Sequence, residues 1–140
     1  MMPRRASTAN EKSGEMEKIT VNLGYVDLGR IDLLVREGFY SNRADFIRTA
    51  IRNQIEVHHN TVAQTIERHT LELGLRVFDK AALEAARAEG ERLHIKVIGL
   101  VRIADDVTPD LALATIGSIT VLGALQASAK LKAALADRIR

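Results

Sequence analysis

The chain has 140 residues and a formal net charge of +2, with 46% hydrophobic and 27% charged residues. This length allows one ordinary domain or two small modules, and the composition is typical of a soluble globular protein. Because the chain has no cysteine, a disulfide scaffold, a thiolate metal site and a cysteine nucleophile are excluded, and a cytoplasmic location is expected.

Residues 1–16 predict a flexible arm, since Ser, Ala, Asn and charged residues dominate this stretch. Arg4 and Arg5 are followed by no apolar stretch, which argues against a secretory signal. No apolar run in the sequence reaches the roughly 18–20 residues that cross a bilayer, so we expect no membrane partner.

Residues 18–23 carry the first periodic pattern. The apolar residues are Ile19, Val21 and Leu23, and they alternate with the polar residues Lys18, Thr20 and Asn22. A period of two is typical of a half-buried β-strand. A lone strand with one apolar face needs a partner strand, which a second copy of the chain can supply. We therefore expect a dimer.

Two helices are expected after Gly24, which ends the alternation. The first is indicated by apolar residues at helical spacing: Leu28, Ile31, Leu34 and Val35. Gly38 stands where a left-handed C-cap would end this helix. Ser41 is predicted as the N-cap of a second helix that continues to Ile55. A unit this small buries little surface alone, which again favours a dimer.

After residue 57 the sequence shows helical and strand patterns in turn. Helical character weakens over residues 58–70, which we interpret as a linker or a helix extension. Hydrophobic alternation predicts strands at residues 71–77 and 94–103. Residues 80–92 are rich in Ala and Glu and predict a helix, with Gly90 near its end.

A weak internal repeat occupies the C-terminal part. Residues 97–103 match residues 121–127 at one fixed offset, and both copies favour strands. Residues 130–140 predict a short terminal helix. We expect residues 71–140 to form a smaller, strand-rich C-terminal domain for oligomerisation or effector binding, with tetramers or higher assemblies as a consequence of exposed strands.

Residues 18–55 resemble the ribbon-helix-helix family of transcriptional regulators, the CopG, Arc and MetJ-like repressors. The resemblance is carried by five short motifs in order: residues 18–23, 31–34, 38–43, 46–48 and 50–51. It implies an α+β protein whose residues 17–57 form a ribbon-helix-helix unit for dimerisation and DNA binding. Many relatives have proline after the strand, where this chain has Gly24.

The resemblance also implies roles for six residues. Two strands pair antiparallel across the dimer, and the ribbon enters the major groove. The residues that match the family's base-contacting positions are Lys18, Thr20 and Asn22. Those that match its phosphate-contacting positions are Ser41, Asn42 and Arg43. Lys, Thr and Asn suit base edges chemically, and a helix N-terminus attracts phosphate.

The expected function is therefore a sequence-specific DNA-binding regulator, a repressor or autoregulator, whose partners are double-stranded DNA and a second copy. Two alternatives remain. In an antitoxin the C-terminal part would wrap a toxin, which the apolar content of residues 93–139 disfavours. In a scaffolding protein DNA binding would serve as an anchor, and the C-terminal domain would assemble.

No metal, cofactor or catalytic site is expected. Nickel-responsive members of the resembled family use His and Cys ligands, but cysteine is absent here and the histidines share no helical face; they are His58, His59, His69 and His94. The acidic residues of the C-terminal part fit a solvated loop before Pro109; they are Asp105, Asp106 and Asp110. No nucleophile and base pattern is present, so an enzyme is not expected.

Overall fold

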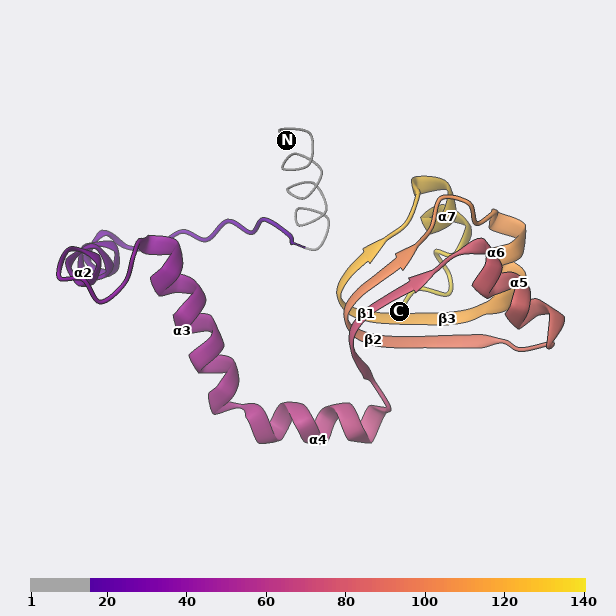
Figure 1. Cartoon of the computed structure of the whole chain (residues 1–140), viewed down its shortest axis with the longest axis horizontal. Coiled ribbons are helices and arrows are strands. Elements are labelled where there is room, and N and C mark those ends of the chain that lie inside the picture. The colour runs from indigo at the N-terminus through magenta and orange to yellow at the C-terminus, as the bar shows by residue number, and fades with distance from the viewer. Residues whose placement is uncertain (1–15) are drawn as a thin grey trace, which may run out of the picture. The chain divides into compact units, whose positions relative to one another are not determined.

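The structure is a computed structural model that describes residues 16–140, and the chain divides into two compact units, residues 1–62 and residues 63–140 (Figure 1). Residues 1–15 of the predicted arm lie outside the described residues. Each unit has its own architecture, helical in the first and α/β in the second.

Three helices follow one another in the N-terminal half: α2 (Tyr25–Arg36), α3 (Arg43–Val57) and α4 (His59–His69). Gly38 ends α2 in a left-handed conformation with φ of 86°. Its amide donates to the Val35 carbonyl at 3.1 Å, and the Phe39 amide donates to Leu34 at 3.0 Å. These two bonds form a Schellman motif, which confirms the predicted C-cap.

The start of α3 corrects the predicted cap. Asn42, and not Ser41, is the N-cap, because its side-chain Oδ1 accepts a hydrogen bond from the Asp45 amide at 2.8 Å. Ser41 stands one residue earlier, where its own amide donates to Asp45 Oδ2 at 2.9 Å. Asn and Ser are equally good caps, so composition alone could not separate neighbouring candidates.

The strand predicted at residues 18–23 is not formed within a single chain, and residues 16–24 carry no regular secondary structure. A strand is defined by its hydrogen-bonded neighbour. No backbone hydrogen bond joins residues 18–23 to another part of the chain that the structure describes.

The C-terminal unit is a repeat of strand and helix. Its elements in order are β1 (Glu72–Phe78), α5 (Lys80–Ala88), β2 (Leu93–Ile103), α6 (Pro109–Thr115), β3 (Ile116–Gln126) and α7 (Ala129–Ala134). The three strands form one parallel sheet in the order β1-β2-β3. The strands run parallel, and helices supply the crossover connections that parallel strands need.

The strands are in register through a column of glycines. Gly74 pairs with Gly99, and Gly99 with Gly123, so the repeat found by sequence is real and has a third copy at β1. All three have φ between 127° and 136°, a region that other residues rarely adopt. A Cβ on Gly99 would lie 2.1 Å from the Gly74 carbonyl oxygen. The strands bend sharply, and α5, α6 and α7 lie inside the bend (Figure 1).

Each copy of the repeat caps its helix in the same way. The residue immediately before each helix accepts a hydrogen bond on its side chain from the amide three residues on: Asp79 from Ala82, Thr108 from Leu111, and Ser128 from Leu131. Two helices are shorter than predicted. α5 stops at Ala88, before a left-handed Gly90, and α7 stops at Ala134.

The chain after α7 pairs with the sheet instead of continuing as a helix. Ile119 of β3 donates its amide to the Arg138 carbonyl at 2.8 Å and accepts from the Arg140 amide at 2.7 Å. The Arg138 side chain donates to the carbonyls of Leu113 and Ile116, at 2.6 and 2.8 Å. The last residues therefore cover part of the β3 edge.

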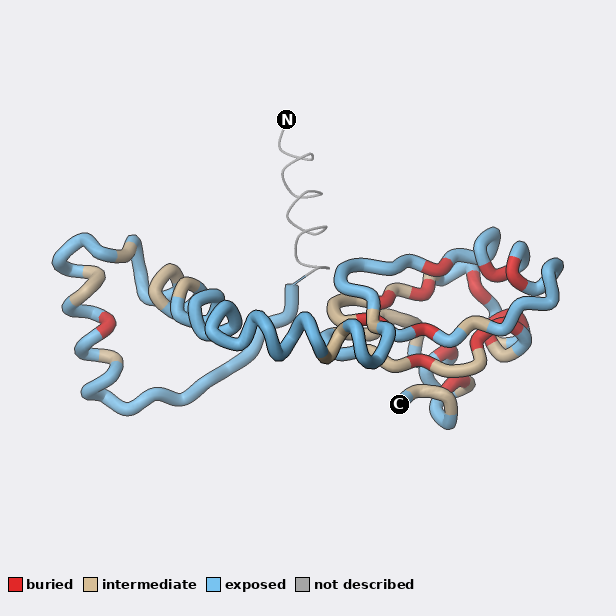
Figure 2. The backbone as a smooth tube through the Cα atoms, turned by 90° about the horizontal axis from the view of Figure 1, so that it is seen from below, coloured by how far each residue is buried: buried red, intermediate tan, exposed pale blue. Residues whose placement is uncertain are grey.

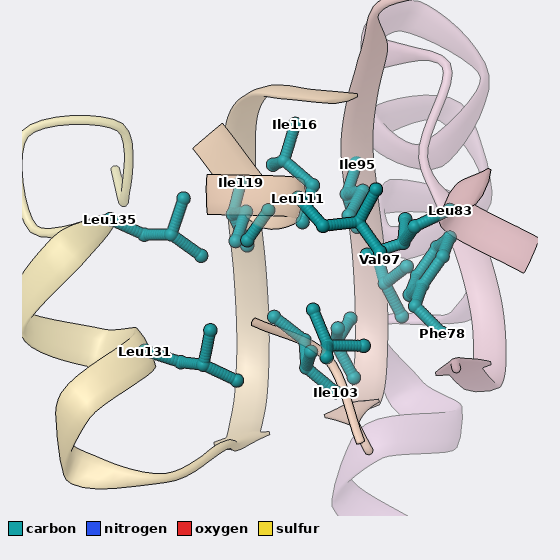
Figure 3. Packing of buried hydrophobic residues seen from close by; sticks show 13 residues of the cluster. Phe78, Leu83, Ile95, Val97, Ile103, Leu111, Ile116, Ile119, Leu131 and Leu135 are labelled. Atoms are coloured by element: carbon teal, nitrogen blue, oxygen red, sulfur yellow. The ribbon is translucent and has the colours of Figure 1, made fainter. Parts of the chain in front are cut away.

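The hydrophobic core lies between the sheet and the three helices (Figure 3). The buried residues from the strands are Phe78, Ile95, Val97, Val101, Ile103, Ile116 and Ile119, those from the helices are Leu83, Leu111, Ala112 and Leu131, and Leu135 is the C-cap of α7. Buried residues are concentrated in this unit, and the described N-terminal half is almost wholly exposed (Figure 2).

Candidate nucleic-acid interface

The segment before α2 presents polar and apolar side chains in alternation. Lys18, Thr20 and Asn22 are all exposed. Ile19 and Val21 are 78% and 72% exposed, which is unusual for large aliphatic side chains within a soluble domain. In an extended chain the two sets point to opposite sides. One side can therefore face a ligand while the other is covered by a partner.

The rest of the N-terminal unit also lacks a core of its own. Within residues 16–62, Ile31 is the only buried hydrophobic residue. α3 exposes a stripe at i, i+4 and i+8, formed by Ile47, Ile51 and Ile55, which are 39%, 49% and 58% exposed. Residues at this spacing share one face of a helix. Such a stripe marks a contact surface, because isolated soluble units rarely expose contiguous apolar patches.

The N-terminus of α3 holds the three residues matched to phosphate contacts. As the first two helical residues, Arg43 and Ala44 have amides without an intrahelical partner, which is a setting that attracts anions. The Asn42 side chain and the Ser41 amide are already occupied by Asp45. The Asp45 carboxylate lies at the same helix end, so a phosphate would meet a charge of its own sign there.

Arg43 is held by an acidic residue of the preceding helix. Its Nε and Nη2 donate to the two carboxylate oxygens of Asp32, each at 2.8 Å, in a bidentate pair that joins α3 to α2. The hydrogen bond with Arg43 lowers the pKa of the Asp32 carboxyl, and the same bond raises the pKa of Arg43. Both side chains remain about half exposed. The Nη1 donors of Arg43 are left for another acceptor.

This ion pair should make the N-terminal unit sensitive to acid. The pKa of Asp32 is lower in the folded chain than in the unfolded chain, so the pair stabilises the fold above about pH 4 and is lost as the pH falls further. We expect the unfolding temperature of the unmodified chain to fall more steeply below pH 4 than that of Asp32→Asn, measured by circular dichroism. Arg43→Gln should flatten the profile in the same way, and identical slopes in all three proteins would contradict the assignment.

Comparison with known proteins matches most of the described chain to one family. The model of the Ribbon-Helix-Helix transcriptional regulator family matches residues 14–132, which span the N-terminal unit and the strand-helix repeats as far as α7. Searches among curated proteins and among solved structures gave no match. Among the described helices, none is both long enough and apolar enough to cross a membrane.

The match covers most of the chain, and it agrees with the order of exposed segment, helix, glycine turn and helix. The family implies a DNA-binding regulator that acts as a dimer, which accounts for the exposed apolar surface of the N-terminal unit. This chain belongs to the ribbon-helix-helix family of transcriptional regulators.

Proposed function

We propose that the protein is a sequence-specific repressor or autoregulator in which residues 18–23 of two copies pair as an antiparallel ribbon in the major groove of DNA. One observation supports this most directly. The segment has no hydrogen-bonding partner in the described chain, yet its alternating sequence leaves both the apolar residues Ile19 and Val21 and the polar residues between them exposed. A second copy supplies the missing strand and covers the apolar side.

The polar side of the ribbon carries groups that read base edges. Lys18 can donate to guanine O6 and N7, and Asn22 can bond adenine N6 and N7. Thr20 offers a hydroxyl group and a methyl group that can contact thymine. All three side chains are exposed in the single chain. We assign base contacts to these three residues in each copy.

Phosphate contacts are assigned to the start of α3. The amides of Arg43 and Ala44 and the Nη1 donors of Arg43 can bind phosphate oxygens, and the Ser41 hydroxyl and Asn42 side chain flank them. Asp32 fixes the Arg43 guanidinium and so reduces the entropy lost on binding. Phosphate contacts set the register of the protein on DNA.

The C-terminal unit is assigned to oligomerisation or effector binding. The antitoxin alternative would need a segment that folds around a toxin, but residues 72–135 already bury a core of their own. The scaffolding alternative would use the same DNA contacts as an anchor. Filaments or large oligomers of the purified protein at micromolar concentration would favour it.

The test is binding to the chain's own promoter DNA by electrophoretic mobility shift, beside an unrelated sequence of equal length. Thr20→Ala and Asn22→Ala should each weaken promoter binding by at least about 30-fold, because each substitution removes one contact from both copies and a lost base contact costs roughly 1–3 kcal/mol. Binding to unrelated DNA should hardly change. If promoter affinity and sequence preference were both unaffected in an intact dimer, the ribbon assignment would be wrong.

Arg43→Gln serves as the matched comparison, because it removes a phosphate contact and no base contact. It should weaken binding to both DNAs about equally and reduce the salt slope by roughly two units, one for each copy. A selective loss of promoter binding in this variant would instead place Arg43 at a base edge.

A further inference from the structure

The outer face of the C-terminal sheet is apolar in register across all three strands. Residues on the inner face enter the core with the helices, and their neighbours along each strand point the other way. The outer apolar face consists of Leu73, Leu75 and Val77 of β1, Ile98 and Leu100 of β2, and Leu122 and Ala124 of β3. One row joins Leu73, Ile98 and Leu122, and the next joins Leu75, Leu100 and Ala124.

This face is uncovered in the single chain. Leu73 is 73% exposed and Leu122 is 58% exposed, at the two ends of one row. Leu75 and Val77 are 46% and 50% exposed. Parallel sheets occur almost only with both faces covered, and here α5, α6 and α7 all lie on the inner side (Figure 1). The sheet therefore lacks its second layer.

We propose that the second layer is the outer apolar face of a second copy of the chain, packed sheet against sheet. The two apolar rows contain no charged residue, so identical faces can meet without repulsion or buried charge. On β2 the charged residues of this face stand at its ends: Lys96 is exposed, and Arg102 bonds the Gln126 amide oxygen at 3.0 Å. An apolar centre with a polar rim is the usual anatomy of a protein interface.

The small area of the outer apolar face favours a contact between two chains that are already held in one dimer. Seven side chains cover less than the roughly 800 Å² per partner of a typical stable interface, so the contact would be weak between free chains. The family's dimer tethers two copies of the C-terminal unit, since only α4 and three residues separate α3 from β1 in each chain. Tethering of this kind gives effective concentrations in the millimolar range. The inference rests on that dimer and is independent of the DNA contacts.

The absence of cysteine allows a direct test in the full chain. Ala124→Cys places a thiol on the outer apolar face, and Ala85→Cys places one on the exposed side of α5. Both variants share the same tether, so chance collisions contribute equally to disulfide formation. We expect Ala124→Cys to form the cross-linked dimer at least tenfold faster under mild oxidation, as resolved by non-reducing electrophoresis.

A second substitution distinguishes packing between two outer apolar faces from strand pairing between two β1 edges. Leu122 lies on β3, two strands away from that edge, and is exposed in the single chain. Adding Leu122→Glu to Ala124→Cys should reduce the cross-linking rate to that of Ala85→Cys, while circular dichroism shows an unchanged fold. Equal rates for Ala124→Cys and Ala85→Cys would overturn the inference. So would a fast rate that Leu122→Glu leaves unaltered.

Discussion

Gly99→Ala is expected to destabilise the C-terminal unit by roughly 3–5 kcal/mol, much of the total stability of a small domain. Two effects add. The backbone at Gly99 has φ of 136°, which strains any residue with a Cβ. The new methyl group would also stand 2.1 Å from the Gly74 carbonyl oxygen, which belongs to the hydrogen-bonded sheet and cannot move aside freely. Urea unfolding with amide exchange of β2 measures the loss.

Gly74→Ala is the matched control for the same column. Its φ is 134°, yet no atom lies within 4 Å of the position that a Cβ would take. The control should therefore lose only the conformational strain, about 1–3 kcal/mol. The difference between the two variants isolates the steric effect of stacking one copy of the repeat on the next. Equal losses would mean that the close approach of the glycines is not what constrains the sheet.

Ile51→Glu is expected to raise the dissociation constant of the dimer by on the order of a thousandfold. Ile51 is the middle residue of the exposed stripe on α3 and contributes nothing to a core within one chain, being 49% exposed. In a symmetric dimer each substitution removes two buried side chains, worth roughly 1.5–3 kcal/mol apiece, and places two carboxylates in an apolar contact. Analytical ultracentrifugation gives the monomer–dimer equilibrium directly.

Asn53→Glu provides the control for the change at Ile51. Two residues along a helix is about 200° of rotation, so this substitution adds the same carboxylate to the opposite side of α3. Its dissociation constant should stay within a few-fold of the unmodified protein. DNA binding should fall in Ile51→Glu only, because a monomer has no ribbon. A stable dimer of Ile51→Glu would show that α3 is not part of the contact.

Local signals in the sequence predicted the local structure well. Gly38 ends α2 as expected, because a left-handed cap depends on one residue and its immediate neighbours. The offset between residues 97–103 and 121–127 also holds in the register of β2 and β3. The copy of the repeat at β1 was not predicted, although Gly74 aligns with the glycines of the other two copies. Glu72 and Arg76 stand at positions that are apolar in those copies, and they obscure the match.

Features that depend on tertiary contacts could not be predicted from the sequence. Asp32 and Arg43 are eleven residues apart, and only the packing of α2 against α3 brings their charges together. The hydrophobic alternation at β1–β3 could not distinguish parallel from antiparallel strands, and of the two crossover helices α5 was predicted and α6 was not. The alternation at residues 18–23 predicted a strand with one apolar face, and a single chain offers no neighbouring strand to pair with it.

The most direct test of the account is amide hydrogen exchange at residues 18–23 in the full-length dimer without DNA. A two-stranded antiparallel ribbon bonds every second amide of each strand to its partner and leaves the others free. We therefore predict protection of alternate amides between Lys18 and Leu23, which disappears in the monomeric Ile51→Glu protein. Unprotected exchange at all of these amides in a dimer would contradict the ribbon.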